Sequence, residues 1–444
     1  VRTEDFYISN RNDSMEYKKA IPLGSPINTD QNEGAQCISP DGNTIYYTAC
    51  SRSDGQGGCD LYVSYKLNGR WSESQNMGYS VNSEAWESQP SISSDGRRLF
   101  FSSDREGGYG GKDIWVCYKN YNGTWTQPKN LGEEVNTPYD DISPFIHWDN
   151  TTLYYASKGK VGMGGYDIFL SKPEGDTGKW SEAENIGYPI NTQKDENSLV
   201  VAKDGKTAYF AAENLTNGRA DLDLYYFELP EKSRARDVAY IQGFVYDADS
   251  RERIGASIEI SDLATDKSIM SLTAFDGLGD FFACLPSDKD YALNVYRDGY
   301  LFHSENFSFE GKAEQQRIFV IEVALKKIKA GELVRLENIF FEHDSYELKP
   351  QSAIELNRIV SFLNNNTSPV IEISGHTDNT GTSSYNMILS RKRAKAIWQA
   401  LLDRGVPGFR ITYKGYGDTV HITANDTEEQ RARNRRTELK IIKP

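Results

Sequence analysis

Gly375-His376-Thr377-Asp378-Asn379-Thr380-Gly381 follows a short run, residues 370–374, in which apolar and polar residues alternate. That alternation predicts a half-buried strand. The Thr, Gly, Asn and Asp residues that come next have the composition of a turn, which we expect to continue to Ser384. This stretch therefore predicts a strand that ends in a polar turn.

A basic helix is predicted directly after the turn. Ser383 or Ser384 can cap its first turn, and the helix runs to about Arg404, where Gly405 suits the position after the last helical residue. An apolar stripe at helical spacing is expected to face a core, and its members are Ala394, Ile397 and Leu401.

Asp378 in the turn and Arg393 on the helix can act together as a clamp for a zwitterion. A carboxylate accepts hydrogen bonds from an ammonium, and a guanidinium holds a carboxylate bidentately. Taken singly, a turn Asp is usually a cap, and a helical Arg is usually solvated. His376 is expected to pin the turn, because no second His or Cys stands beside it at metal-ligand spacing.

Residues 333–442 resemble the OmpA-like peptidoglycan-binding domain. Five blocks in order carry the resemblance: Ile339-Phe340-Phe341 with Ser345, Leu348 and Pro350; the Gly375–Gly381 stretch; Leu389-Ser390-Arg391-Lys392-Arg393-Ala394; Gly415-Tyr416-Gly417; and Asn434-Arg435-Arg436-Thr437-Glu438. The resemblance implies an α/β fold in which Asp378 and Arg393 grip diaminopimelate in the peptidoglycan stem peptide. It also implies, more weakly, that the site includes Phe341, Glu342, Thr377, Asn386, Asn434 and Arg435. The family often has Asp where this chain has Glu342.

Length, composition and charge bound the remaining possibilities. A chain of 444 residues should form several domains, and it contains no apolar run long enough to span a membrane. Its net charge is −14, divided as −16 over residues 1–330 and +2 over residues 331–444. This acidity argues against nucleic-acid binding. The first residues read as a strand within a domain, so we expect a fragment or a processed form.

The five cysteines divide into two groups. Cys50 and Cys59 flank a loop between two predicted antiparallel strands, so we expect a disulfide in an oxidising compartment; two reduced, half-buried thiols are the alternative. Cys37, Cys117 and Cys284 lie in strand patterns and are expected to be small core residues.

A repeat of about 54 residues fills the first half of the chain. Each unit has a hairpin turn, an aromatic strand, a Gly-rich loop, an Asp-initiated strand and a fourth strand near a Trp; the turns are Ser39-Pro40-Asp41-Gly42, Ser93-Ser94-Asp95-Gly96, Trp148-Asp149-Asn150 and Ala202-Lys203-Asp204-Gly205. Four strands per unit predict the blades of a β-propeller, and the repeats resemble the TolB-like and WD-type class. Four units plus a partial one at Asp5–Ile8 suggest five blades over residues 1–233, with four or six as the alternatives. The repeated Asp residues at 60, 113, 167 and 223 are expected to tie down turns, and the Trp residues to pack between blades.

A third module is expected between the propeller and the last domain. Residues 238–327 have a β pattern that resembles the carboxypeptidase regulatory-like domain, a seven-stranded β-sandwich without peptidase activity, which we interpret as a spacer or docking module. Short linkers at 234–238 and 326–331 separate it from its neighbours, which leaves residues 332–444 for the OmpA-like domain. The whole order resembles envelope proteins of the Bacteroidetes type, among them a component of the type IX secretion system. In such proteins a lipoprotein signal and a helical-repeat segment would precede this chain.

Two classes of function follow from these expectations. The first is a non-catalytic, periplasmic anchor without cofactor or metal, which binds peptidoglycan with its last domain and docks periplasmic or outer-membrane proteins with its propeller. The alternative is a peptidoglycan-targeted hydrolase or a propeller peptidase. The sequence has neither a Gly-x-Ser-x-Gly elbow nor a His-Glu-x-x-His motif, which disfavours the enzyme.

Overall fold

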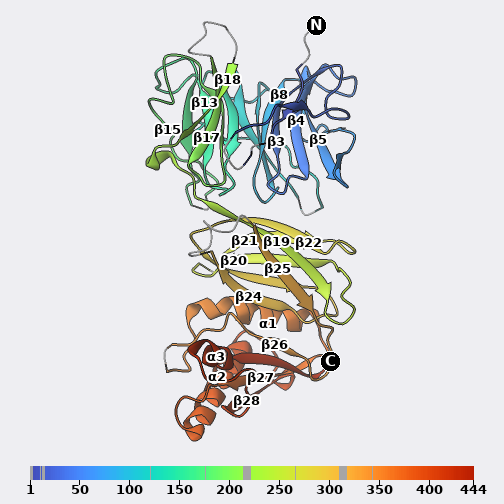
Figure 1. Cartoon of the computed structure of the whole chain (residues 1–444), viewed down its shortest axis with the longest axis vertical. Coiled ribbons are helices and arrows are strands. Elements are labelled where there is room, and N and C mark those ends of the chain that lie inside the picture. The colour runs from blue at the N-terminus through green and yellow to red at the C-terminus, as the bar shows by residue number, and fades with distance from the viewer. Residues whose placement is uncertain are drawn as a thin grey trace. The chain divides into compact units, whose positions relative to one another are not determined.

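The structure is a computed structural model in which residues 4–444 are described, apart from 11, 13–15, 121, 176, 214–221, 266, 310–317 and 343 and the side chains of 212, 213, 222 and 223. It divides into two compact units (Figure 1). The first unit comprises residues 1–239 and 284–286, and the second comprises residues 240–283 and 287–444. The Asp223 side chain, one of the four repeated Asp residues, lies outside this description.

The first unit is built from antiparallel sheets that repeat one strand order. The strands are β3 (Asn32–Ile38), β4 (Thr44–Cys50), β5 (Cys59–Leu67), β6 (Arg70–Trp71) and β7 (Gln75–Asn76); β8 (Glu87–Ile92), β9 (Arg98–Ser103), β10 (Asp113–Tyr118) and β11 (Lys129–Asn130); β12 (Asp141–Ile146), β13 (Leu153–Ser157), β14 (Asp167–Ser171) and β15 (Glu184–Asn185); and β16 (Asn197–Val201), β17 (Thr207–Glu213) and β18 (Leu222–Glu228). A two-stranded sheet of β1 (Tyr7–Ile8) and β2 (Ile21–Pro22) precedes them. The short 3-10 helix η1 (Glu231–Ser233) follows them.

Consecutive sheets contact each other through their first strands. β3 contacts β8, β8 contacts β12, and β12 contacts β16. Trp125 and Trp180 pack edge-on against Tyr46 and Phe100 of the preceding sheet, with ring centroids 6.5 and 5.9 Å apart, as expected for packing between repeats. The short fourth strands β7, β11 and β15 begin four residues after the Trp of their repeat, a little later than the sequence pattern indicated. A closed propeller stays a prediction.

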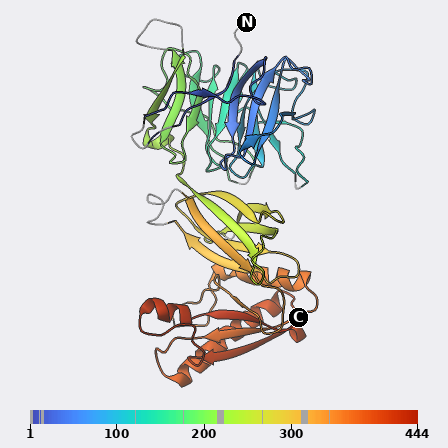
Figure 2. The same ribbon diagram turned by 45° about the vertical axis from the view of Figure 1, so that its right-hand side comes forward.

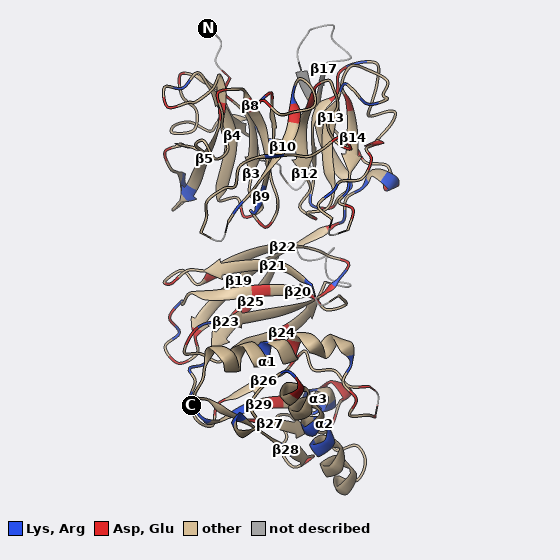
Figure 3. Cartoon of the chain, turned by 180° about the vertical axis from the view of Figure 1, so that it is seen from behind, with Lys and Arg blue, Asp and Glu red and all other residues tan. Residues whose placement is uncertain are grey.

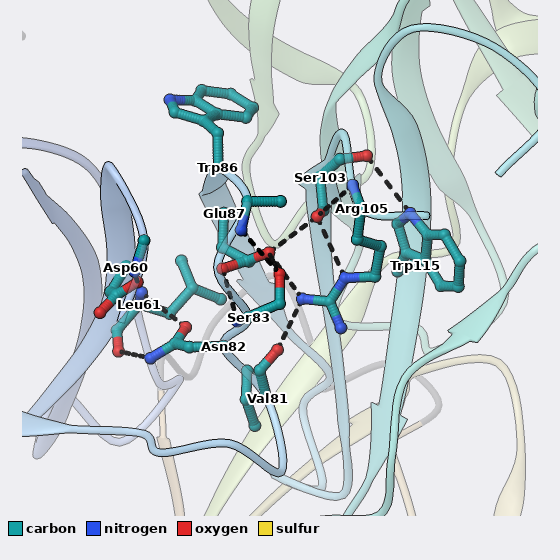
Figure 4. Close-up of polar contacts among 12 residues, drawn as sticks. Asp60, Leu61, Val81, Asn82, Ser83, Trp86, Glu87, Ser103, Arg105 and Trp115 are labelled. Atoms are coloured by element: carbon teal, nitrogen blue, oxygen red, sulfur yellow. Dashed lines mark hydrogen bonds and ion pairs between the residues drawn. The ribbon is translucent and has the colours of Figure 1, made fainter. Parts of the chain in front are cut away.

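The Val-Asn and Ile-Asn pairs of the repeat join one sheet to the next, and Figure 4 shows the first of them, Val81-Asn82. The Asn82 side chain accepts a hydrogen bond from the Leu61 amide at 2.9 Å and donates one to the Leu61 carbonyl at 3.0 Å, so it acts as a strand partner for β5. Asn136 pairs with Ile114 in the same way, and Asn191 with Ile168. Each buried side-chain amide therefore pairs with both the backbone N–H and the backbone C=O of one strand residue. The three carbonyls also accept from the backbone amides of Met77, Leu131 and Ile186.

A buried ion pair fixes the start of the next sheet. Glu87 opens β8, accepts hydrogen bonds from the Ser83 amide and hydroxyl, and lies 2.9 Å from Arg105, which also donates to the Val81 carbonyl at 2.7 Å (Figure 4). Glu33 and Arg52 form the equivalent pair one repeat earlier. Because both carboxylates are fully buried and both guanidinium groups are largely buried, we interpret these pairs as structural.

The repeated Asp residues hold the Gly-rich loops. Asp60 accepts from the amides of Gln56 and Gly57, and Asp113 and Asp167 accept from the amides of the corresponding loops. The turn-stabilising role expected from the sequence is therefore present at these three positions. A disulfide between Cys50 and Cys59 closes the first of these loops.

The second unit begins with two sheets (Figure 2). One has the order β22-β19-β25, and the other β21-β20-β23-β24. The strands are β19 (Val238–Asp247), β20 (Ala256–Asp262), β21 (Ser268–Ala274), β22 (Asp280–Pro286), β23 (Asp290–Tyr296), β24 (His303–Ser308) and β25 (Ile318–Leu325). We call residues 240–325 the two-sheet module. β19 and β25 run parallel, in register from Tyr240↔Ile318 to Asp247↔Leu325.

The C-terminal domain has one four-stranded sheet of order β26-β29-β27-β28, in which β27 and β28 are parallel and the other pairs are antiparallel. Its elements are β26 (Leu333–Arg335), η2 (Pro350–Ser352), α1 (Ala353–Asn365), β27 (Val370–His376), α2 (Ser383–Asp403), η3 (Gly408–Arg410), β28 (Ile411–Gly417), α3 (Glu428–Asn434) and β29 (Thr437–Lys443). α1 and α2 contact each other and share one apolar core with the sheet, which includes the predicted stripe Ala394, Ile397 and Leu401.

Candidate functional site

The predicted strand, turn and helix correspond to β27, residues 377–382 and α2. The helix cap differs from the expectation: Thr382, rather than Ser383 or Ser384, has extended backbone angles and accepts from the Tyr385 amide. Gly405 follows the helix with φ +88°, a conformation that favours glycine. Gly375 is tightly enclosed, because an added Cβ would lie 2.3 Å from the Ser390 carbonyl of α2. This close approach brings the turn after β27 against the helix that carries Arg393.

Asp378 is buried in the turn, and its two carboxylate oxygens have different hydrogen-bond partners. Oδ2 accepts from Arg435 Nη1 at 2.6 Å, and Oδ1 accepts from the Thr380 amide at 2.8 Å. Burial opposes ionisation, but the Arg435 guanidinium and the Thr380 amide outweigh it and lower the pKa of Asp378 below its usual value. The carboxylate is therefore charged and oriented before any ligand arrives.

Arg393 projects from α2 over the hairpin that follows residue 340. Its Nε donates to the Ser345 carbonyl at 2.9 Å, and its guanidinium lies 5.1 Å from the centre of the Phe341 ring. Burial lowers the pKa of this guanidinium, but an arginine still stays charged at neutral pH. Among the described residues, its Nη atoms have no hydrogen-bond partner, which leaves the bidentate end of the side chain for another group.

Arg393 and Arg435 line the same small cavity. Its volume is about 100 Å³, and its lining residues are Arg335, Leu336, Glu337, Ile339, Phe341, Gly375, His376, Arg393, Arg435, Arg436 and Thr437. Since a water molecule takes up about 30 Å³, the cavity has room for roughly three waters or one carboxylate group. Four guanidinium groups against one carboxylate in this lining favour an anionic occupant. Figure 3 shows further basic residues along α2.

The weaker site predictions divide into residues near the clamp and residues with other contacts. Asn386 donates from its side chain to the Asp378 carbonyl at 3.2 Å, and Thr377 is buried beside it. Asn434 is fully buried, and its side-chain amide accepts from and donates to residues of the loop 422–425. It therefore stabilises this loop and does not line the cavity. Glu342 is exposed, and its side chain lies 3.7 Å from Lys349.

His376 is enclosed between strands at the back of the cavity. Its ring stacks on Tyr416 with centroids 5.1 Å apart, and its Nε2 lies 3.2 Å from Glu438. Burial would raise the pKa of Glu438, but His376 and Arg436 overcome this and lower it to about 2. These contacts fix the position of His376 in the wall of the site.

The sequence reasoning missed several residues around Arg393. Tyr385 donates to Asp344 at 2.5 Å and so ties α2 to the hairpin that carries Ser345. Arg335, Glu337 and Arg436 reach the cavity from β26, the segment after it and the segment before β29. The five-block pattern contained Arg436. Nothing in the local sequence indicates the Tyr385–Asp344 hydrogen bond or the place of Arg335 in the cavity, because both bring together segments that are far apart in the chain.

Comparison with known proteins identifies this part of the chain. Residues 340–435 match the model of the OmpA family. These residues form an OmpA-like domain. They lie within one unit of a larger β-rich chain whose other parts this match does not cover.

Several curated proteins are similar over the same part. The chain is 36% identical to outer membrane porin F of Pseudomonas fluorescens over 25% of this chain and 34% of that protein. It is 33% identical to the peptidoglycan-associated lipoprotein of a Buchnera aphidicola strain, over 26% of this chain and 62% of that protein. It is 39% identical to the peptidoglycan-binding protein ArfA of Mycobacterium tuberculosis, over 23% of this chain and 32% of that protein. The chain thus spans between about a third and two thirds of these relatives. Among solved structures, it is 32% identical to the peptidoglycan-associated lipoprotein from Burkholderia pseudomallei, over 23% of this chain and 87% of that chain, with a TM-score of 0.22.

The helices of the described residues are too short or too polar to span a membrane.

Proposed function

We propose that this chain is a non-catalytic, periplasmic anchor that binds the diaminopimelate of a peptidoglycan stem peptide through Asp378 and Arg393. In this proposal residues 332–444 form the wall-binding domain, residues 238–327 a β-sandwich, and residues 1–233 a propeller of five blades. The propeller docks envelope or secretion-system proteins, which places the chain at the peptidoglycan and the outer membrane.

One observation carries the binding proposal: Arg393 and Arg435 line a single cavity, and Asp378 is held next to it by Arg435. A carboxylate of the ligand would occupy the cavity between the two guanidinium groups. Its neighbouring ammonium would bind Asp378, whose charge is already stabilised. Two of the similar proteins are named for their association with or binding to peptidoglycan, which supports the same ligand.

Docking by the first unit has its own support. Tyr79, Tyr139 and Tyr188 are between 63% and 76% exposed on the connecting loops of the repeats. Large exposed aromatic side chains are typical of protein interfaces, where they provide contact area at a small entropic cost.

Calorimetric titration tests the clamp directly. A stem peptide that contains diaminopimelate is titrated into the full chain, its Asp378→Ala and Arg393→Ala variants, and Arg391→Ala as a matched control. Arg391 lies on the same helix but is exposed and outside the cavity lining. We expect saturable binding that both site variants lose and the control keeps.

A folded wild type that binds no stem peptide would overturn the proposal. Release of soluble fragments from purified peptidoglycan by the full chain would instead support the hydrolase alternative.

A further inference from the structure

Helix α1 of the OmpA-like domain has two buried faces. One face packs into the core of its own domain, through Leu356, Ile359 and Leu363. The other carries Glu355, Arg358 and Phe362, whose spacing of three and four residues places them in one row along a helix.

This second row contacts the two-sheet module. The Ser304 hydroxyl of β24 donates to Glu355, and Arg358 forms an ion pair with Glu259 of β20. The Phe362 ring lies 5.6 Å from Phe302, which shares the core of the OmpA-like domain. The two-sheet module therefore packs directly on α1 and is not separated from it by a free linker.

Strand β24 also holds the segment that leads from β26 into the site. Asn338 is fully buried, and its amide donates to the Ser304 hydroxyl at 2.7 Å and to Glu355 at 3.1 Å. Asn306 donates to the Glu337 carbonyl at 2.9 Å. Two adjacent residues, 337 and 338, are thus fixed by side chains of the neighbouring module.

The same segment forms one wall of the cavity. Arg335, Glu337 and Phe341 all line it, and Phe341 supports the Arg393 guanidinium. A shift of the backbone at 337–338 would move these side chains, because only two residues separate Asn338 from Phe341. Binding geometry at this cavity therefore depends on contacts made from outside the domain that contains it.

We propose that Ser304 and Asn306 of the two-sheet module are positioning residues for the peptidoglycan site. In this proposal, β24 holds residues 337 and 338 in the position that peptidoglycan binding requires. This inference rests on the proposed function of the cavity. It assigns the module a role that neither a spacer nor an independent docking domain would have.

Calorimetric titration of the diaminopimelate stem peptide into the full chain tests this role. Asn306→Ala should weaken binding about 3- to 10-fold, the effect expected when one neutral hydrogen bond is lost, and Ser304→Ala, which removes two hydrogen bonds, should weaken it at least as much. Asn306 is exposed, so its variants should fold even if Ser304→Ala does not. Ser271→Ala, at the exposed far edge of the same sheet, is the matched control and should bind like the wild type.

Two further variants separate positioning from simple loss of stability. Asn306→Asp preserves the shape but removes the donor to Glu337, so it should bind as weakly as Asn306→Ala. Ser304→Thr keeps the hydroxyl and should restore affinity. Wild-type affinity in folded Asn306→Ala and Asn306→Asp would overturn this inference alone, whereas no binding by the folded wild type would overturn the proposed function and this inference together.

Discussion

Replacing Glu355 by Gln tests whether a carboxyl group in α1 keeps its proton near neutral pH. The side chain is fully buried, and burial raises the pKa of Glu355 to about 7. Hydrogen bonds from Ser304 and Asn338 and the charge of Arg358 oppose the rise, and Glu337 adds to it. Arg358 is itself paired with Glu259, so it compensates Glu355 only in part.

The direction of the effect follows from the proton balance. The pKa of Glu355 is higher in the folded chain than in the unfolded chain, so between about pH 4.5 and 7 the unfolded state has lost a proton that the folded state keeps. The free energy of unfolding therefore falls as the pH rises through this window and levels off above it. At about 1.4 kcal/mol per pKa unit, the fall amounts to about 3 kcal/mol. Gln cannot ionise, so Glu355→Gln should escape this loss.

Amide hydrogen exchange of α1 in the full chain measures this difference, because it reports the free energy of opening of that helix. After correction for intrinsic exchange rates, the variant should match the wild type at pH 4.5 and exceed it by about 3 kcal/mol at pH 8. Glu429→Gln, an exposed residue on α3, is the control and should follow the wild type. Parallel curves for Glu355→Gln and the wild type from pH 4.5 to 8 would refute the reasoning.

Three other outcomes are expected. Arg435→Ala should raise the pKa of Asp378, measured as the midpoint of its carboxyl NMR titration, because it removes the ion pair at 2.6 Å; an unchanged midpoint would contradict the contact. Asn136→Ala should lower the stability of the first unit by about 1–3 kcal/mol in thermal unfolding, because it removes the partner of the Ile114 amide, while the Ile114 carbonyl keeps the Leu131 amide; exposed Asn122→Ala should cost little, and equal stabilities would count against a structural role for Asn136. A Lys-type stem peptide should bind more weakly than the diaminopimelate peptide in calorimetry, because it lacks the carboxylate for Arg393; equal affinities would argue against the clamp.

Local sequence signals located the elements of the site well. Alternation at 370–374 predicted β27, and the turn composition at 377–384 predicted the turn after it, which the structure ends two residues earlier, at 382. Both predictions depend on nearby residues alone. The cap was misassigned because Thr382, Ser383 and Ser384 all have hydroxyl groups, and only the backbone angles distinguish the residue outside the helix from those within it.

Contacts between segments that are distant in the chain could not be predicted from the sequence. Arg435 was only a weak site prediction, yet it is the residue that pairs with Asp378, 57 positions away. Nothing in the sequence indicated that Glu355 is buried, because a Glu in the first turn of a helix is usually solvated and interacts favourably with the helix dipole. Its burial depends on Ser304, a residue of another module 51 positions earlier.

The parallel pairing of β19 with β25 has a mechanical consequence. The chain enters this sheet at the start of β19 and leaves it at the end of β25, so the two attachment points lie at opposite ends of neighbouring strands. A pulling force between the OmpA-like domain and the first unit would load all eight register pairs of this ladder in shear at once. Strands loaded in shear share the tension among their hydrogen bonds, whereas peeled strands break them one at a time. In the proposed anchoring role, this ladder would therefore resist extension of the chain between its two attachment points.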